Sequence, residues 1–122
     1  MHPLPPPSPV TESNLVEIPC NWYMEDMTPM QYLPTVANSH GFVSPETIER
    51  NWKARFEYLY DEEIDGAKHD FVFPLVLHPD TSGMAHVIGM IERVIVWLKS
   101  WEGVEFTTFG KCATEWKQRR SS

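Results

Sequence analysis

Residues 71–86 read FVFPLVLHPDTSGMAH, and the rest of the chain is best interpreted outward from this stretch. Its first seven residues are almost all apolar, which is typical of a strand buried on both faces, as in a parallel sheet. The run stops at His78-Pro79, and a polar turn over residues 80–83 leads into a helical pattern. His78 therefore stands at the C-terminal end of a predicted strand, where α/β folds place their chemistry. Pro74 has no N–H to donate, so we expect an edge, a bulge or an irregular end there.

A helix is predicted upstream of this stretch. Ser44 suits the N-cap, Pro45 the first helical position and Glu46 the first turn. The apolar residues that follow at helical spacing form one face, made of Ile48, Trp52, Phe56 and Leu59. The helix should fade around residues 62–63, and Asp65-Gly66 should form a turn.

A second helix is predicted downstream, from Ser82 to Trp101, with Gly103 as its stop signal. Two apolar stripes on this helix indicate that more than half of its surface is buried. A last helix is expected from Thr108 onward. The segment 21–27 mixes large aromatic residues with carboxylates and has neither a helical nor a strand period, so we expect a loop.

The order of elements predicts an α/β fold. Strands are expected at residues 15–19, 71–77 and 104–106, and helical segments between them favour parallel pairing. Three strands make a poor closed sheet, because a parallel sheet needs both faces covered and both edges managed. We therefore expect part of a larger barrel. The predicted organisation is a proline-rich arm at 1–14, the domain portion at 15–118 and a tail at 119–122.

Composition excludes some classes of protein. The chain has 122 residues, is 42% hydrophobic and carries a net charge of −7, which indicates a globular protein and argues against a nucleic-acid surface. No apolar stretch reaches the roughly 18–20 residues of a membrane helix, and no signal peptide is seen, so we expect a cytoplasmic location. Cys20 and Cys112 belong to no CxxC pair and are predicted to be small buried residues in a reducing compartment.

Three features could carry chemistry, and each has a simpler structural explanation. His78 suits a general acid or base, since its ordinary pKa is about 6.5, but a strand-end histidine can also just bond backbone groups. Glu25 and Asp26 could orient that histidine, as a carboxylate does in a triad, or lie on a solvated loop. Trp22 and Tyr23 could stack on a sugar or form core. None of the five histidines lies in a metal-binding pair, so a complete zinc site is not expected.

Three runs of sequence resemble the C-terminal half of a polysaccharide deacetylase of the NodB-homology family. They are EIPCNWYMEDMTPM (17–30), NSHGFVSPETIERNWKARFEYLY (38–60) and FVFPLVLHPDTSGMAHVIGMIERVIVWLKSWEGVEF (71–106). The subgroup most similar to them holds peptidoglycan-deacetylase-like and allantoinase-like proteins. The resemblance implies a distorted (β/α) barrel and hydrolysis of non-peptide C–N bonds, usually in the N-acetyl group of an amino-sugar polymer such as chitin or peptidoglycan.

The resemblance also assigns roles to residues. His78 matches the general acid of the family, and Glu25 and Asp26 match the carboxylates that support it. Three residues are implied to bind substrate: Trp22 as an aromatic wall, with Val76 and Leu77 beside the acid. Val76 stands where relatives usually have the leucine that lines the pocket for the acetyl methyl group, and Met84 stands where they often have arginine.

The family's divalent, zinc-like metal and its general base come from a Thr-Phe-Asp-Asp segment and a His-x-x-x-His motif, and this chain has neither. We therefore expect no metal ligands here and an inactive chain by itself, completed by the missing N-terminal half or present as a homo-oligomer. The implied partner is an amino-sugar polysaccharide. Two alternatives stay open: an allantoinase-like hydrolase of a small cyclic amide, and a non-catalytic remnant that binds carbohydrate or serves as an oligomer subunit.

Overall fold

The computed structural model of the protein describes residues 3–121. These residues form two compact units, each of which is described by itself. The larger unit is Pro19–Phe106, and the smaller one consists of the described residues before and after it. The division of the chain predicted from the sequence stays a prediction.

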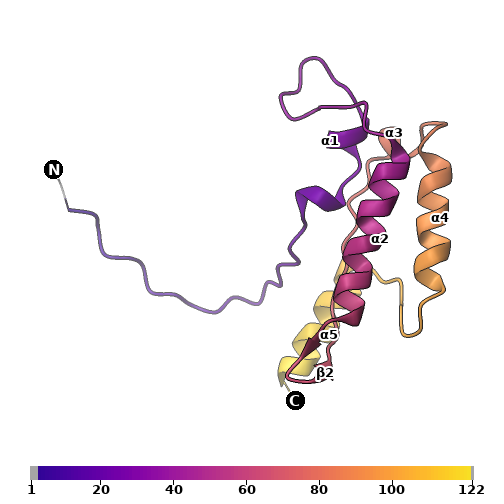
Figure 1. The fold of residues 1–122 in the computed structure, drawn as a ribbon. Coiled ribbons are helices and arrows are strands. Elements are labelled where there is room, and N and C mark those ends of the chain that lie inside the picture. Colours follow the sequence, from indigo (N-terminus) through magenta and orange to yellow (C-terminus); the bar gives the residue numbers. More distant parts are fainter. Residues whose placement is uncertain (1–2, 122) are drawn as a thin grey trace. The chain divides into compact units, whose positions relative to one another are not determined.

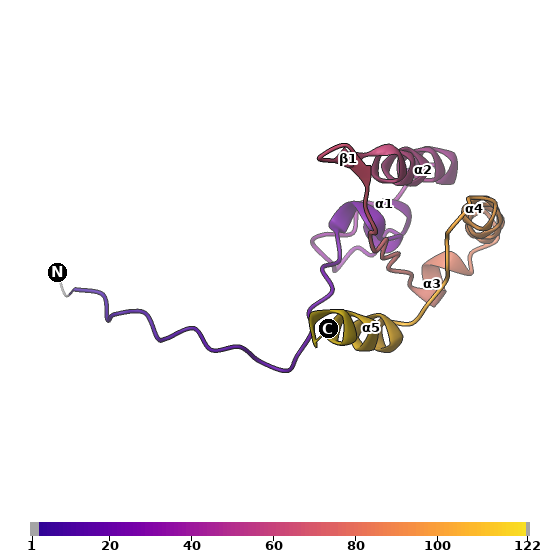
Figure 2. The ribbon, with the colours of Figure 1, turned by 90° about the horizontal axis from the view of Figure 1, so that it is seen from below.

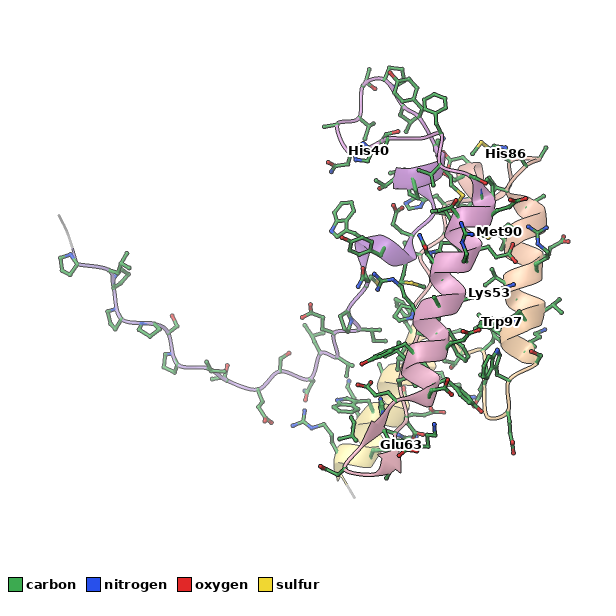
Figure 3. All side chains as sticks on the ribbon, in the orientation of Figure 1. His40, Lys53, Glu63, His86, Met90 and Trp97 are labelled. Atoms are coloured by element: carbon green, nitrogen blue, oxygen red, sulfur yellow. The ribbon has the colours of Figure 1, made fainter. Side chains whose placement is uncertain are left out.

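Two long helices dominate the larger unit. Helix α2 (Pro45–Asp61) runs alongside α4 (Ile88–Lys99), and Figures 1 and 2 show the pair in two views. Figure 3 shows Lys53 of α2 and Trp97 of α4 between them, and the Lys53 amine lies 5.3 Å from the centre of the Trp97 ring. The buried core comprises Met24, Met30, Ile48, Trp52, Phe56, Val87, Met90, Ile91, Val94 and Leu98.

Helix α2 and the turn after it form as predicted. The Ser44 hydroxyl accepts from the N–H of Glu46 at 3.2 Å, Pro45 occupies the first turn and the helix ends at Asp61. Two short antiparallel strands follow, β1 (Glu63–Ile64) and β2 (Ala67–Lys68). Asp65 and Gly66 join them with φ values of 53° and 77°, which suits a tight two-residue hairpin.

The prediction of a strand at residues 71–77 is wrong. Within the described residues its one strand-type pairing is an isolated parallel bridge, between Glu25 and Val76. The apolar character of the run comes instead from packing against the core, through Phe71, Phe73 and Leu75. A strand needs a neighbour along its whole length to form a ladder, and here the neighbouring segment meets it at only one residue.

The strands predicted at residues 15–19 and 104–106 are also absent from the described part of the chain. The fold is therefore a mixture of helices with two short strands, and α/β holds only in this coarse sense. The larger barrel stays a prediction.

The predicted second helix is divided in two. Helix α3 (Pro79–Ser82) follows His78 directly, a turn covers residues 83–87, and α4 then begins at Ile88 and ends at Lys99, before Gly103. Pro79 explains the early start, because proline is favoured in the first turn of a helix and disfavoured in its interior. His86 consequently lies in the turn and not on the helix.

The loop predicted over residues 21–27 also needs correction. It contains a 3-10 helix, η1 (Trp22–Met24), and the start of the short helix α1 (Met27–Met30). Asn21 caps η1, since its side-chain oxygen accepts from the N–H of Tyr23 at 2.8 Å. Local capping of this kind leaves no hydrophobic periodicity in the sequence, which is why the pattern did not show it.

The smaller unit contains one helix. Residues 3–14 lack regular secondary structure and are exposed, and their role as a proline-rich arm stays a prediction. Helix α5 (Phe109–Ser121) confirms the predicted last helix, and the Thr108 hydroxyl accepts from the N–H of Lys111 at 3.1 Å at its start. Arg120 lies 3.4 Å from Glu12, an exposed ion pair that contributes little to stability.

The cysteine prediction is wrong in one respect. Cys20 is exposed and Cys112 half-buried, so neither is a core residue, and the described structure contains no disulfide between them. Among the described helices, none has the length and apolar character required to cross a bilayer.

Replacing Trp52 by phenylalanine is expected to lower the free energy of unfolding by about 1–2 kcal/mol. Trp52 is buried, and its Nε1–H donates to the Tyr23 carbonyl at 3.0 Å, which ties α2 to η1. Phenylalanine removes this bond and leaves unfilled volume. Urea unfolding measures the change, with Tyr58→Phe on the exposed face of α2 as the control, expected within about 0.5 kcal/mol of the unsubstituted chain. Equal stability of both variants would contradict the structural role of the indole.

Candidate functional site

At the start of helix α3, His78 lies beside Glu25 and Asp26. These two acids are neighbours in the sequence, and Asp26 precedes His78 by 52 positions. His78 is the N-cap residue of α3, and Asp26 is the N-cap residue of α1. The side-chain Nδ1 of His78 lies 2.7 Å from Oδ1 of Asp26 and 3.8 Å from Oε2 of Glu25. The isolated bridge beside them fixes the two backbone segments, since Val76 N–H donates to Met24 O at 3.0 Å and Asp26 N–H to Val76 O at 3.3 Å.

Asp26 is completely buried and fully engaged. The backbone N–H of His78 lies 3.0 Å from each oxygen of its carboxylate, and the Ser82 hydroxyl also donates to Oδ2. A buried carboxylate is stable only when its charge is paired and its oxygens accept hydrogen bonds, and Asp26 meets both conditions. The arrangement fixes the carboxylate against the imidazole of His78.

Glu25 has a different partner set. Its two oxygens accept from the N–H groups of Met27 at 2.9 Å and Thr28 at 2.8 Å, the unpaired donors at the start of α1. Glu25 is buried as well. The alternative that these two acids lie on a solvated loop is therefore excluded. Both carboxylates are buried and hydrogen-bonded next to His78.

The surroundings of His78 favour its charged form. The hydrogen bond that the imidazole donates to Asp26 raises its pKa above 6.5, and the charges of Asp26, Glu25 and Asp80 add to the effect, while burial opposes it. The side chain is 37% exposed. Nδ1 is directed to Asp26, and within residues 3–121 Nε2 makes no hydrogen bond. A charged imidazole held in this way can donate a proton from Nε2.

Pattern reasoning missed Ser82, Thr81 and Gln31. The Thr81 hydroxyl donates to Oε1 of Gln31, and Nε2 of Gln31 donates to Asp80 at 3.2 Å, so the residue after α1 is tied to α3. One signal was present in the sequence: His78-Pro79 reads as an N-cap followed by the first helical position. A helix beginning there places Ser82 one turn from His78, on the side where it meets Asp26.

Trp22, Val76 and Leu77, which the resemblance implied to bind substrate, differ from one another in exposure. Trp22 lies on η1 and is 70% exposed, so it is no core residue. Val76 is half-buried and meets Glu25 through the backbone bridge, while Leu77, just before His78, is exposed. Their roles stay predictions.

Glu25, Asp26 and His78 each offer a metal-ligand atom within 4.8 Å of the others. Their hydrogen bonds do not fit a metal site. Both carboxylates already accept from backbone N–H groups, and Nδ1 of His78 is bonded to Asp26 rather than directed at a common centre. A histidine whose Nδ1 is bonded to a carboxylate can bind a metal only through Nε2, so Nδ1 of His78 and the Asp26 oxygen bonded to it do not share one ion.

Comparisons with known proteins give two relatives. A peptidoglycan deacetylase-like protein of Gibberella zeae is 60% identical over 117 residues, which cover 94% of this chain and 34% of the relative. A peptidoglycan deacetylase of Helicobacter pylori is 40% identical over 108 residues, covering 88% of this chain and 35% of the relative. The chain thus spans about a third of the length of the curated relatives it matches. No family model matches it.

Proposed function

We propose, because the chain belongs to the polysaccharide deacetylase family, that it supplies the proton-donor side of a deacetylase site, with His78 as general acid. The observation that carries the proposal is the pairing of His78 with the fully buried Asp26. A general acid must be protonated when it acts, and this pairing raises the pKa of the imidazole, which favours the protonated form.

The reaction needs such a donor. Hydrolysis of an N-acetyl group adds water to the acyl carbon and breaks the C–N bond, giving acetate and a free amine. The amine is a poor leaving group as an anion, so a proton from Nε2 of His78 is delivered to the nitrogen as the bond breaks. Asp26 keeps Nδ1 occupied and stabilises the charged imidazole beforehand, and Glu25 adds a second negative charge nearby.

The proposed substrate is an N-acetylated amino-sugar polymer of the peptidoglycan or chitin kind. The Helicobacter pylori relative is named a peptidoglycan deacetylase. Trp22 presents an exposed ring on η1 that suits the apolar face of a sugar, and Val76 and Leu77 lie immediately before His78, where an acetyl methyl group would meet the acid.

We propose that this chain supplies neither the general base nor the metal ligands of the reaction. Glu25 and Asp26 are buried with their oxygens engaged, so neither can take a proton from water. The family's divalent metal is not held by these residues, for the same reason. We expect the 122-residue chain by itself to release no acetate. A cytoplasmic location and a homo-oligomer remain predictions.

A chimera tests the proposal. This chain replaces the matching 108-residue segment of the Helicobacter pylori relative, and acetate release is measured from peptidoglycan fragments and from soluble N-acetylglucosamine oligomers. The unaltered relative, active in the same assay, is the positive control. We expect the chimera to release acetate at a rate within about a hundredfold of that control. Ring opening of a cyclic ureide without acetate release would favour the allantoinase-like alternative, and a folded but inactive chimera would contradict the proposal.

A further inference from the structure

The loop between α1 and α2, residues 31–43, is held rigidly at its base. Figure 1 shows this loop running out past α1 and returning to the start of α2. The Thr28 carbonyl accepts from the N–H groups of His40 at 3.0 Å and Gly41 at 3.2 Å, and the Pro29 carbonyl accepts from Val43 at 3.0 Å. These bonds fix the C-terminal end of the loop on α1, and the loop begins directly after that helix.

The interior of the loop is fixed as well. Ser39 is buried, its hydroxyl donates to the Gln31 carbonyl, and the same oxygen accepts from the N–H of Leu33 at 2.6 Å. A surface that is already ordered loses little conformational freedom on binding, so its contacts contribute more of their energy to affinity.

Tyr32 and Phe42 form an aromatic pair on this loop, which we name the aromatic platform. Their ring centres lie 5.4 Å apart with the planes tilted by 34°. Gly41 permits the close approach, because a Cβ there would lie 2.6 Å from Cβ of Tyr32. Tyr32 is 53% exposed and Phe42 86%, and neither belongs to the core cluster. The platform therefore places two rings in solvent on a rigid support.

The backbone at Phe42 is strained. Its φ is 63°, in the left-handed region that a bulky side chain adopts at a cost of about 1–3 kcal/mol. The Phe42 ring gains little burial in return. Within the described residues the ring packs on Tyr32, and strain at an exposed ring motivates the hypothesis that a ligand contacts it.

The platform is connected to the proposed site through Gln31. This residue directly precedes Tyr32, and its side chain is bonded to Thr81 and Asp80 of α3. His78 caps that same short helix. The platform and the proposed acid are thus connected through one set of hydrogen bonds.

We infer that the aromatic platform is a sugar-binding subsite, which holds one ring of the amino-sugar polymer whose N-acetyl group is presented to His78. The inference rests on the proposed function. Two rings offer too small an area for a stable protein partner, which needs about 800 Å² on each side. They match the C–H face of one pyranose ring, and the Tyr32 hydroxyl and the exposed His40 on the same loop (Figure 3) offer hydrogen bonds to its edge.

Titration of the 122-residue chain with a soluble tetramer of N-acetylglucosamine tests the inference, with binding followed by two-dimensional NMR and calorimetry. We expect saturable binding that shifts the amide signals of residues 31–43. Tyr32→Ala and Phe42→Gly are each expected to raise Kd about three- to tenfold, the range for loss of one aromatic contact. Tyr58→Ala, which removes an exposed ring from α2, is the matched control and should leave Kd unchanged.

Phe42→Gly separates binding from folding. Glycine adopts φ of 63° without strain, so the variant should unfold at the same urea concentration as the unsubstituted chain, or a higher one, while it loses affinity. A merely structural ring would give the opposite pattern. Unchanged Kd in both platform variants, or no saturable binding by the unsubstituted chain, would overturn the inference.

Failure of the inference and failure of the proposed function give different results. If only the inference fails, the chimera releases acetate in a His78-dependent manner and the platform variants leave its KM unchanged. If only the proposed function fails, the tetramer still binds through Tyr32 and Phe42 while replacement of His78 has no effect on acetate release. The second outcome leaves the platform as a carbohydrate-binding site on a non-catalytic protein.

Discussion

His78→Gln in the chimera is expected to lower kcat for acetate release by about 10²–10⁴-fold, the usual contribution of a general acid. Glutamine approximates the size of the imidazole and can still accept or donate a hydrogen bond, but it cannot transfer a proton at neutral pH. The carboxylate of Asp26 remains in place beside it. KM should change little, since the proton is needed as the C–N bond breaks and not for binding.

The leaving group provides a sharper test of the same role. A substrate whose amine leaves readily without protonation, such as an activated anilide of acetate, needs the acid less, so the loss caused by His78→Gln should shrink towards tenfold or below. A substitution that merely disturbed the structure would slow both substrates equally. His86→Gln, in the exposed turn before α4, is the matched histidine control and should leave both rates unchanged. Equal rates for His78→Gln and the unsubstituted chimera would remove His78 from the mechanism.

Local signals in the sequence predicted α2 well, because its apolar face lies within the 17-residue helix, its caps flank that helix directly, and both depend on few distant contacts. The run at 71–77 was misread for the opposite reason. An apolar segment predicts burial, but whether it forms a strand depends on a neighbouring backbone that periodicity cannot show. The chain buries Phe71 and Phe73 against the aromatic ring of Phe56 instead.

The site was predictable in part. The resemblance placed His78 with Glu25 and Asp26, and the structure brings these residues together. Their burial was not predictable, since adjacent carboxylates usually lie in solvent and only the capping of α1 and the bonds to His78 stabilise them here. The place of Ser82 could have been predicted, because a helix that begins at Pro79 puts Ser82 one turn after His78. The pair His78-Pro79 indicates only a turn when proline is considered solely as a helix breaker. The platform loop had no periodic signal of any kind.

Asp26→Asn is expected to lower the pKa of His78 and the free energy of unfolding, the latter by about 1.5–3 kcal/mol for loss of hydrogen bonds to a charged group. The hydrogen bond that His78 donates to Asp26 is the main cause of the raised pKa. Because the folded pKa is raised above its unfolded value, the charged imidazole contributes stability that is fully present below the unfolded pKa of about 6.5. That stability is lost as pH rises through the folded pKa. Without the carboxylate, this dependence should flatten.

Two measurements on the 122-residue chain check this expectation: an NMR titration of the His78 ring and urea unfolding at several pH values from 5.5 to about 9. Asp80→Asn is the matched control. It removes the same charge from an exposed position whose effect on the pKa of His78 is the smallest of those named, so the titration should move only slightly. A comparable fall in the pKa of His78 in both variants would show that the surrounding negative charges, and not the hydrogen bond to Asp26, raise the pKa of the imidazole. The buried carboxylate would then be a structural cap for the start of α3, and the case for His78 as a tuned acid would rest on the kinetics alone.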